Sequence, residues 1–123
     1  MLKKFLLAFI ISLTSAPALC ANIFIPGYDT IHFKAAEITQ EVMFRNPIEN
    51  KCSFMMRLTL EDGTDVWTAD QPLYPGEVFV NIDLEHVLAR GIYRNAVMKY
   101  ECYTLDGGAR LNGAEIRVTL EVK

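Results

Sequence analysis

The chain has 123 residues, which is enough for one domain of ordinary size and too short for two. Its 12 Lys and Arg residues are outnumbered by 15 Asp and Glu residues, and 51% of the chain is hydrophobic. This acidic balance leaves no basic surface for a phosphate backbone, which argues against nucleic acid as a partner.

The first 21 residues have the layout of a secretory signal peptide. Lys3 and Lys4 precede an apolar run over residues 5–13, and smaller residues follow. That run is too short to span a ~30 Å hydrocarbon core. The sequence therefore predicts a signal peptide over 1–21 and an exported chain, periplasmic or extracellular, with a retained N-terminal anchor as the alternative. Its removal leaves 10 basic against 15 acidic residues, a net charge of about −5.

Three cysteines bear on the compartment. Cleavage after Ala18, Cys20 or Ala21 is open, and a site past Cys20 avoids an odd thiol. Lipidation of Cys20 is the less favoured alternative because bulky Leu19 precedes it. After cleavage past Cys20, Cys52 and Cys102 remain, an even number that suits an oxidising location.

Residues 22–123 alternate between apolar and polar positions with a period of two, which predicts half-buried strands. The alternating stretches are 31–35, 42–44, 52–61, 78–85, 96–103 and 116–122. Turn signals separate them, at Asn46-Pro47, Asp62-Gly63, Pro75-Gly76, Asp106-Gly107-Gly108 and Asn112-Gly113. About seven short strands, with at most a helical turn over 84–90, predict a single all-β domain: an antiparallel sandwich of two sheets.

Both remaining cysteines fall on the inward phase of their strands. We therefore expect a disulfide between Cys52 and Cys102 that crosses the core of the sandwich. Closing a loop of about fifty residues would stabilise the fold by roughly 4 kcal/mol in the chain-entropy model. That is a large share of the stability of a domain this small.

The pattern resembles an immunoglobulin-type domain. Trp67 follows Cys52 by fifteen residues, Tyr100 stands two positions before Cys102, and Tyr93 is a second candidate for the tyrosine at the sheet corner. In that family a Trp packs on the disulfide between the sheets, and the corner tyrosine bonds back to the backbone. The resemblance implies an immunoglobulin-like β-sandwich and its bridge. Trp67 follows Asp62-Gly63, however, which places it one strand later than the Trp of the family.

A second resemblance covers nearly all of residues 22–123. It rests on Ile25-Pro26-Gly27-Tyr28, Asn46-Pro47, Asn50, Cys52, Asp62-Gly63, Trp67, Pro75-Gly76, Gly91, Tyr93 and Asn112-Gly113-Ala114-Glu115. Together these are similar to small exported bacterial domains that have no assigned activity. The resemblance implies a bacterial source and a location in the cell envelope.

Residues that usually carry catalysis are sparse in this region. Ser53 is its only serine, and it lies on the polar phase of a flat strand without the sharp turn that presents a nucleophile. His32, on a polar phase, and His86, in a loop, are expected to be surface residues. We therefore predict no catalytic residues and expect that the chain is not an enzyme.

No cofactor or metal site is predicted. No paired C-x-x-C or H-x-x-x-H sequence completes a zinc site with the cysteines. Glu61, Asp62 and Asp65 offer a weak calcium site, but a solvated turn in which Asp62 caps its own backbone is the favoured interpretation.

Several apolar residues occupy the otherwise polar phase of their strands: Met43, Met55, Phe79, Val97 and Tyr103. Because Met55, Val97 and Tyr103 lie on the strands of the two cysteines, they form the predicted partner face. Cover by the loop 70–76, or by the N-terminal segment, is the alternative.

The sequence therefore favours a non-catalytic interaction module of the bacterial envelope, whose partner is another envelope or extracellular protein. An adhesin-like or fibre-forming subunit is an alternative, weakened because only residues 22–28 precede the first strand. A glycan-binding domain is another, with Trp67 beside Asp65, or Tyr28 beside Asp29, as the sugar platform. Packing of Trp67 on the Cys52–Cys102 bridge is favoured over that role.

Overall fold

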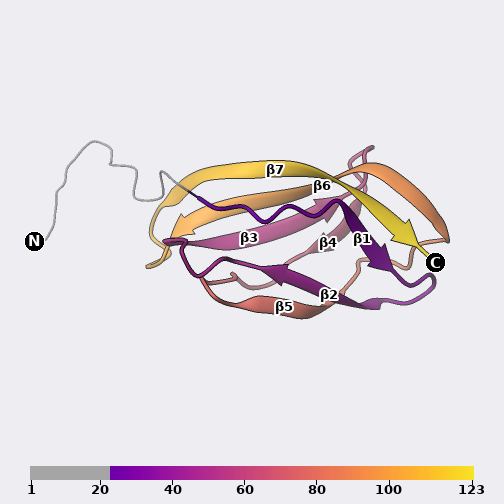
Figure 1. Cartoon of the computed structure of the whole chain (residues 1–123), viewed down its shortest axis with the longest axis horizontal. Coiled ribbons are helices and arrows are strands. Elements are labelled where there is room, and N and C mark those ends of the chain that lie inside the picture. The colour runs from indigo at the N-terminus through magenta and orange to yellow at the C-terminus, as the bar shows by residue number, and fades with distance from the viewer. Residues whose placement is uncertain (1–22) are drawn as a thin grey trace, which may run out of the picture.

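The computed structural model describes residues 23–123, so the predicted signal peptide and Cys20 lie outside the described residues. Residues 23–123 form seven strands and no helix. The strands are β1 (Thr30–Phe33), β2 (Thr39–Arg45), β3 (Cys52–Thr59), β4 (Asp65–Thr68), β5 (Val78–Asp83), β6 (Gly91–Thr104) and β7 (Arg110–Val122). One sheet has the order β1-β7-β6-β3-β4, and β2 pairs with β5 in a second sheet (Figure 1). The predicted all-β, sandwich-like fold is confirmed.

The large sheet is antiparallel except at one edge. β6 runs antiparallel to both β3 and β7, but β1 pairs with β7 in parallel. The prediction of an antiparallel sandwich is therefore wrong for this pair. β1 pairs with the last part of β7, Thr119 to Val122. The first and last strands therefore lie side by side at the edge of the sheet.

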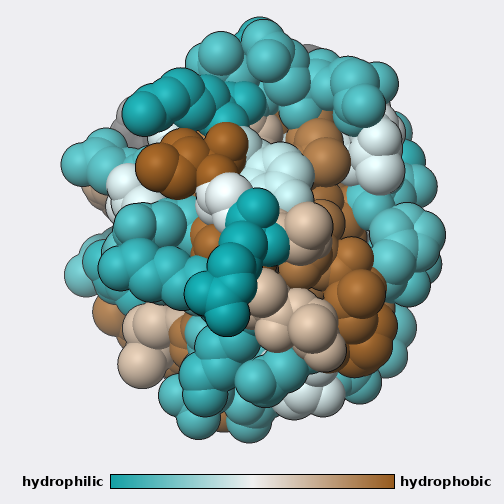
Figure 2. Space-filling model, turned by 90° about the vertical axis from the view of Figure 1, so that its right-hand side faces the viewer, coloured by the Kyte–Doolittle hydropathy of each residue, from teal (hydrophilic) through white to brown (hydrophobic). Residues whose placement is uncertain are grey.

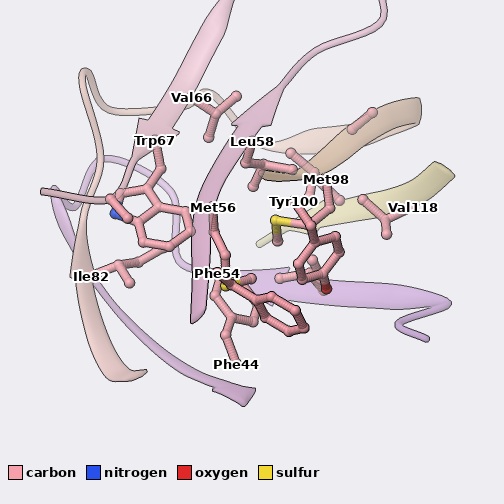
Figure 3. Packing of buried hydrophobic residues seen from close by; sticks show 14 of the residues in the cluster. Phe44, Phe54, Met56, Leu58, Val66, Trp67, Ile82, Met98, Tyr100 and Val118 are labelled. Atoms are coloured by element: carbon pink, nitrogen blue, oxygen red, sulfur yellow. The ribbon is translucent and has the colours of Figure 1, made fainter. Parts of the chain in front are cut away.

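The core lies between the two sheets, as Figure 3 shows. Alternate residues of β3, β6 and β7 enter it, and Leu58 pairs with Met98 at its centre. From β2 and β5 come Phe44 and Ile82, and both are buried. The period-two alternation predicted for 52–61, 96–103 and 116–122 therefore identifies the inward face of these strands correctly.

Cys52 and Cys102 are both buried, but they do not face each other across the core. In the register of β3 and β6, Cys52 pairs with Thr104 and Cys102 pairs with Phe54, so the cysteines are diagonal neighbours within one sheet. They lie 4.4 Å apart, and the predicted disulfide is not confirmed. The prediction of a bridge between the sheets is wrong, because alternation identifies the face of a strand but not its sheet.

The alternation predicted for 78–85 fails in part. Gln40 lies opposite Ile82, and Phe44 lies opposite Phe79. The five residues 40–44 of β2 therefore face only the four residues 79–82 of β5. This bulge breaks the alternation on β5. Phe79 turns inward against Trp67, while Val78 and Val80 are 41% and 54% exposed. No helical turn follows over residues 84–90.

The predicted turns differ in outcome. Asp62-Gly63 joins β3 to β4, and residues 106–108 join β6 to β7, as predicted. Asn112-Gly113 lies inside β7, where the register with β6 shifts. A Cβ atom at Gly113 would collide with the carbonyl oxygen of Tyr100, so the glycine permits close approach of two backbones and does not mark a turn.

Of the two tyrosines considered for the sheet corner, Tyr93 makes a hydrogen bond back to the backbone. It lies near the start of β6, and its hydroxyl donates a hydrogen bond to the carbonyl oxygen of Ala89 at 2.7 Å. Tyr100, the first candidate, is buried in the middle of β6, where its ring packs edge-on against Phe54. Burial raises the pKa of Tyr100 far above the usual value of a phenol.

A buried amide network joins the N-terminal segment to the loop before β3. Asn46 donates to the carbonyl oxygens of Cys52 and Leu73, each at 2.9 Å. Asn50 donates to the side-chain oxygen of Asn46 and to the carbonyl of Phe24, and it accepts the N–H of Phe24. The Asn50 amide thus pairs with the Phe24 backbone as a neighbouring strand would.

Candidate functional site

The predicted partner face lies on the outer surface of the large sheet. Met55, Val97 and Tyr103 are half-buried, and all lie on the face opposite the core. Met55 pairs with Glu101, which places it beside Tyr103, whereas Lys99 and Glu101 separate Val97 from both. The Tyr103 hydroxyl also donates to Glu101 at 3.2 Å. The three residues share a face, but polar side chains divide them.

The three residues considered for catalysis lie apart. Ser53 is buried, although the sequence predicts that it is solvated, because its cross-strand partner Tyr103 covers the same face. His32 is exposed and 3.1 Å from Glu121, and His86 is exposed in the loop after β5. Among residues 23–123 no three His, Cys, Asp or Glu side chains are placed to share a metal ion.

The acidic turn between β3 and β4 is held by its own hydrogen bonds. Asp62 accepts the backbone N–H of Thr64 at 2.9 Å, and hydrogen bonds from Thr64 hold the pKa of Asp62 below its usual value. Asp65 pairs with Arg57 at 2.7 Å. This geometry is that of the favoured interpretation, a solvated turn with a capping aspartate.

Trp67 belongs to the core and not to a sugar platform. Only 5% of it is exposed. Its ring lies 5.6 Å from Phe44 of β2 and 5.6 Å from Phe79 of β5, between centroids. The burial favoured from the sequence is therefore confirmed, whereas packing on a Cys52–Cys102 bridge stays a prediction. The rings beside Trp67 are those of Phe44 and Phe79 in the second sheet. The resemblance to immunoglobulin domains instead implies a disulfide beside the tryptophan.

Three exposed apolar residues lie on the strands of the small sheet. Met43 of β2 is 62% exposed, and Val78 and Val80 of β5 are also exposed. Figure 2 looks onto the end of the sandwich at the right of Figure 1, where separate apolar areas are interrupted by hydrophilic side chains. Ile92, which pairs with Glu121 near the C-terminus, is a further exposed apolar residue.

A trough runs along the side of β5 that does not pair with β2. One groove, with a volume of about 540 Å³, is lined by Gln71, Pro72, Leu73, Tyr74, Glu77, Val78 and Phe79. A second, of about 270 Å³, is lined by Trp67, Thr68, Asp70, Gln71, Phe79, Asn81, Ile82 and Asp83. Gln71 and Phe79 line both, so the two grooves adjoin along the edge of the strand.

The opposite open side, between β1 and β2, is partly covered. The Tyr28 hydroxyl accepts the backbone N–H of Arg45 at 3.1 Å, at the edge of β2. The ring of Tyr28 packs edge-on against Phe44. Burial raises the pKa of Tyr28 above its ordinary value of 10.0, so this cover stays uncharged at physiological pH.

Other strand edges carry features that oppose pairing. β1 and β4 are four residues long, and β2 has a bulge together with Glu41 and Arg45. The stretch of β7 that does not pair with β1 carries Arg110, Glu115 and Arg117. Short length, charge and bulges all protect an edge from pairing with another chain.

β5 has fewer of these protections, because Asp83 is its only charged residue and the extra residue of the bulge lies on β2. It has six residues, Val-Phe-Val-Asn-Ile-Asp, with no Lys, Arg or Pro, and it pairs only with β2. Strict alternation places Val78 and Val80 in the core, so the pattern of the sequence does not predict this site. The available signal was the absence of a positive charge or proline from an entire strand.

No model of a protein family matches the chain, and neither a curated protein nor a solved structure matches it. No helix within residues 23–123 is long and apolar enough to cross a membrane.

Proposed function

We propose that the chain is an exported, non-catalytic binding module that recognises an extended segment of another envelope or extracellular protein. The segment adds as a strand to the open edge of β5. The observation that carries this proposal is the open edge itself, with exposed Val78 and Val80 beside a trough. In strand addition, backbone hydrogen bonds supply affinity and pockets for alternate side chains supply specificity.

The trough suits this mode of binding. Phe79 and the largely buried Trp67 line it between β5 and β4, and Tyr74 stands exposed at one end. Side chains of an added strand point alternately to the two faces of the sheet. One set would lie over Val78 and Val80, and the other would enter the trough.

The fold proposed with this function is of immunoglobulin type. β3, β6 and β7 correspond in order to the strands C, F and G of that fold, and β2 and β5 correspond to B and E. Tyr93 supports the proposal because it forms the corner hydrogen bond at the start of the F-like strand. β4 then extends the C-F-G sheet, which accounts for the position of Trp67 one strand after β3.

Two alternative functions are less well supported. A fibre-forming subunit needs a free extension for its neighbour, whereas Ile23 and Ile25 pack against the chain's own core and Phe24 is bonded to Asn50. A glycan platform needs a wet aromatic ring, but Trp67 is buried and the half-buried Tyr28 ring packs against Phe44. Strand addition needs neither feature.

Photo-crosslinking in intact cells tests the site. A photoreactive aromatic residue placed at Val80 is expected to give a specific adduct with a partner protein, because the side chain borders the proposed binding edge. The matched position is Ile92, which is comparably exposed at 57% but lies on another strand. A third probe at Met55 reports on the face predicted from the sequence. Adducts at Met55 alone, or equal adducts at Val80 and Ile92, would contradict the assignment to β5.

The disulfide remains a prediction, now between neighbouring strands of one sheet. An oxidising location is expected to join Cys52 to Cys102, since both lie on the inner face of β3 and β6. Alkylation of the denatured exported protein, followed by mass spectrometry, checks this. We expect no adduct on either cysteine before reduction and an adduct on each afterwards. Modification of both cysteines without reductant would show that the bridge does not form.

A further inference from the structure

The trough along β5 has a one-sided charge. Three carboxylates line it, from Asp70, Glu77 and Asp83, and its lining contains no Lys, Arg or His. None of the three is in an ion pair with a residue of the described chain. Glu77 accepts the N–H of Tyr74 at 2.8 Å, and Asp83 accepts the hydroxyl of Thr39 at 2.6 Å. Both groups are therefore held in position while their charge stays uncompensated.

We infer that the segment bound at β5 is basic as well as extended, with Lys or Arg placed against these carboxylates. This inference rests on the proposed function, because the same edge provides the backbone hydrogen bonds. Glu77 and Asp83 are six positions apart at the two ends of β5. In an extended partner the matching cations are also about six residues apart, since paired strands have nearly equal rise per residue. The residues between them are apolar or β-branched, to lie against Val78, Val80 and the trough.

A second copy of this chain does not meet these requirements. If two β5 strands paired antiparallel about Val80, Asp83 of one copy would lie opposite Glu77 of the other. Like charges directly opposite across a strand pair are destabilising. The charge of the trough thus selects a partner of different sequence and disfavours self-association through this edge.

Synthetic peptides separate the contribution of the strand edge from that of the charge. The first peptide is Lys-Thr-Val-Thr-Val-Thr-Lys, the second has Glu in place of both Lys residues, and the third is the first with alternate backbone amides N-methylated. Binding to the isotope-labelled exported protein is followed by NMR through the amide signals of β5. The basic peptide is expected to shift these signals, the N-methylated peptide to leave them unchanged, and the acidic peptide to bind roughly tenfold more weakly.

A charge-neutral variant of the protein provides the reciprocal test. Its changes conserve size and an acceptor oxygen: Asp70→Asn, Glu77→Gln and Asp83→Asn. The variant is expected to bind the basic peptide roughly tenfold more weakly, and to bind the basic and acidic peptides alike. The matched control removes three exposed carboxylates that do not line the trough: Asp29→Asn, Glu37→Gln and Glu115→Gln. The control is expected to retain the preference for the basic peptide.

The possible outcomes distinguish the two proposals. Equal binding of basic and acidic peptides, still abolished by N-methylation, would overturn the basic partner and leave strand addition in place. Shifts at β5 with no effect of N-methylation would overturn strand addition. If no peptide shifted the β5 signals at millimolar concentration, both proposals would be overturned.

Discussion

Replacing Trp67 with alanine is expected to lower the free energy of unfolding by about 4 kcal/mol, the usual cost of removing a large buried aromatic side chain. Trp67 is the only tryptophan of the chain and makes ring contacts with both strands of the small sheet. Its loss opens a cavity and weakens the contact between the sheets. Urea unfolding of the exported protein, followed by circular dichroism, measures the change.

Trp67→Phe provides a milder test that does not require the alanine variant to fold, and it is expected to retain part of the lost stability. The matched surface change is Ile92→Ala, expected to alter the free energy of unfolding by no more than about 0.5 kcal/mol. In the parent protein, Trp67 fluorescence should be blue-shifted and resist quenching by acrylamide, because the ring is buried. Red-shifted, easily quenched emission would instead favour a solvent-exposed sugar platform.

Replacing Asn46 with alanine is expected to lower the free energy of unfolding by about 3 kcal/mol, since buried groups that lose a hydrogen-bond partner cost about 1–3 kcal/mol each. The Asn46 amide donates to two carbonyls, of Cys52 and Leu73, and its oxygen accepts from Asn50. At 1% exposed, the site gives water no access to take over these bonds. Urea unfolding again provides the measurement.

A second variant tests the role of the two donors. Asn46→Asp conserves the size of the side chain but directs a carboxylate at two carbonyl oxygens, so it is expected to be at least as destabilising as alanine. Asn112→Ala is the matched control, because Asn112 is exposed on β7. A loss below about 1 kcal/mol for Asn46→Ala would mean that the network adds little to stability.

Local pattern was sufficient to predict the class of fold. Alternation in β3, β6 and β7 identified the inner residues, because successive side chains of a strand point to opposite faces whichever strands flank it. Asp62-Gly63 was predicted as a hairpin for a similarly local reason: Gly63 adopts a φ of 91°, which glycine tolerates without cost.

Bulges explain where local pattern failed. On β5, at the register shift, Phe79 lies on the inner face, where alternation predicts Val80. On β7, Asn112-Gly113 resembles a turn in sequence but lies in the strand, because Gly113 lets two backbones approach closely. Each bulge depends on the strand opposite, so it cannot be identified from one strand alone. The candidate site at β5 was missed for this reason.

The sequence by itself determined that this chain forms an all-β fold, which residues of its regular strands face inward, and where its sharpest turns lie. Each of these follows from backbone geometry over a few neighbouring residues. Only the tertiary structure decided that Cys52 and Cys102 share a sheet, that Trp67 packs against the small sheet, and that β5 keeps an open edge. Those features depend on which strands pair over long distances in the chain, and pairing is set by hydrogen bonds and packing that alternation does not encode.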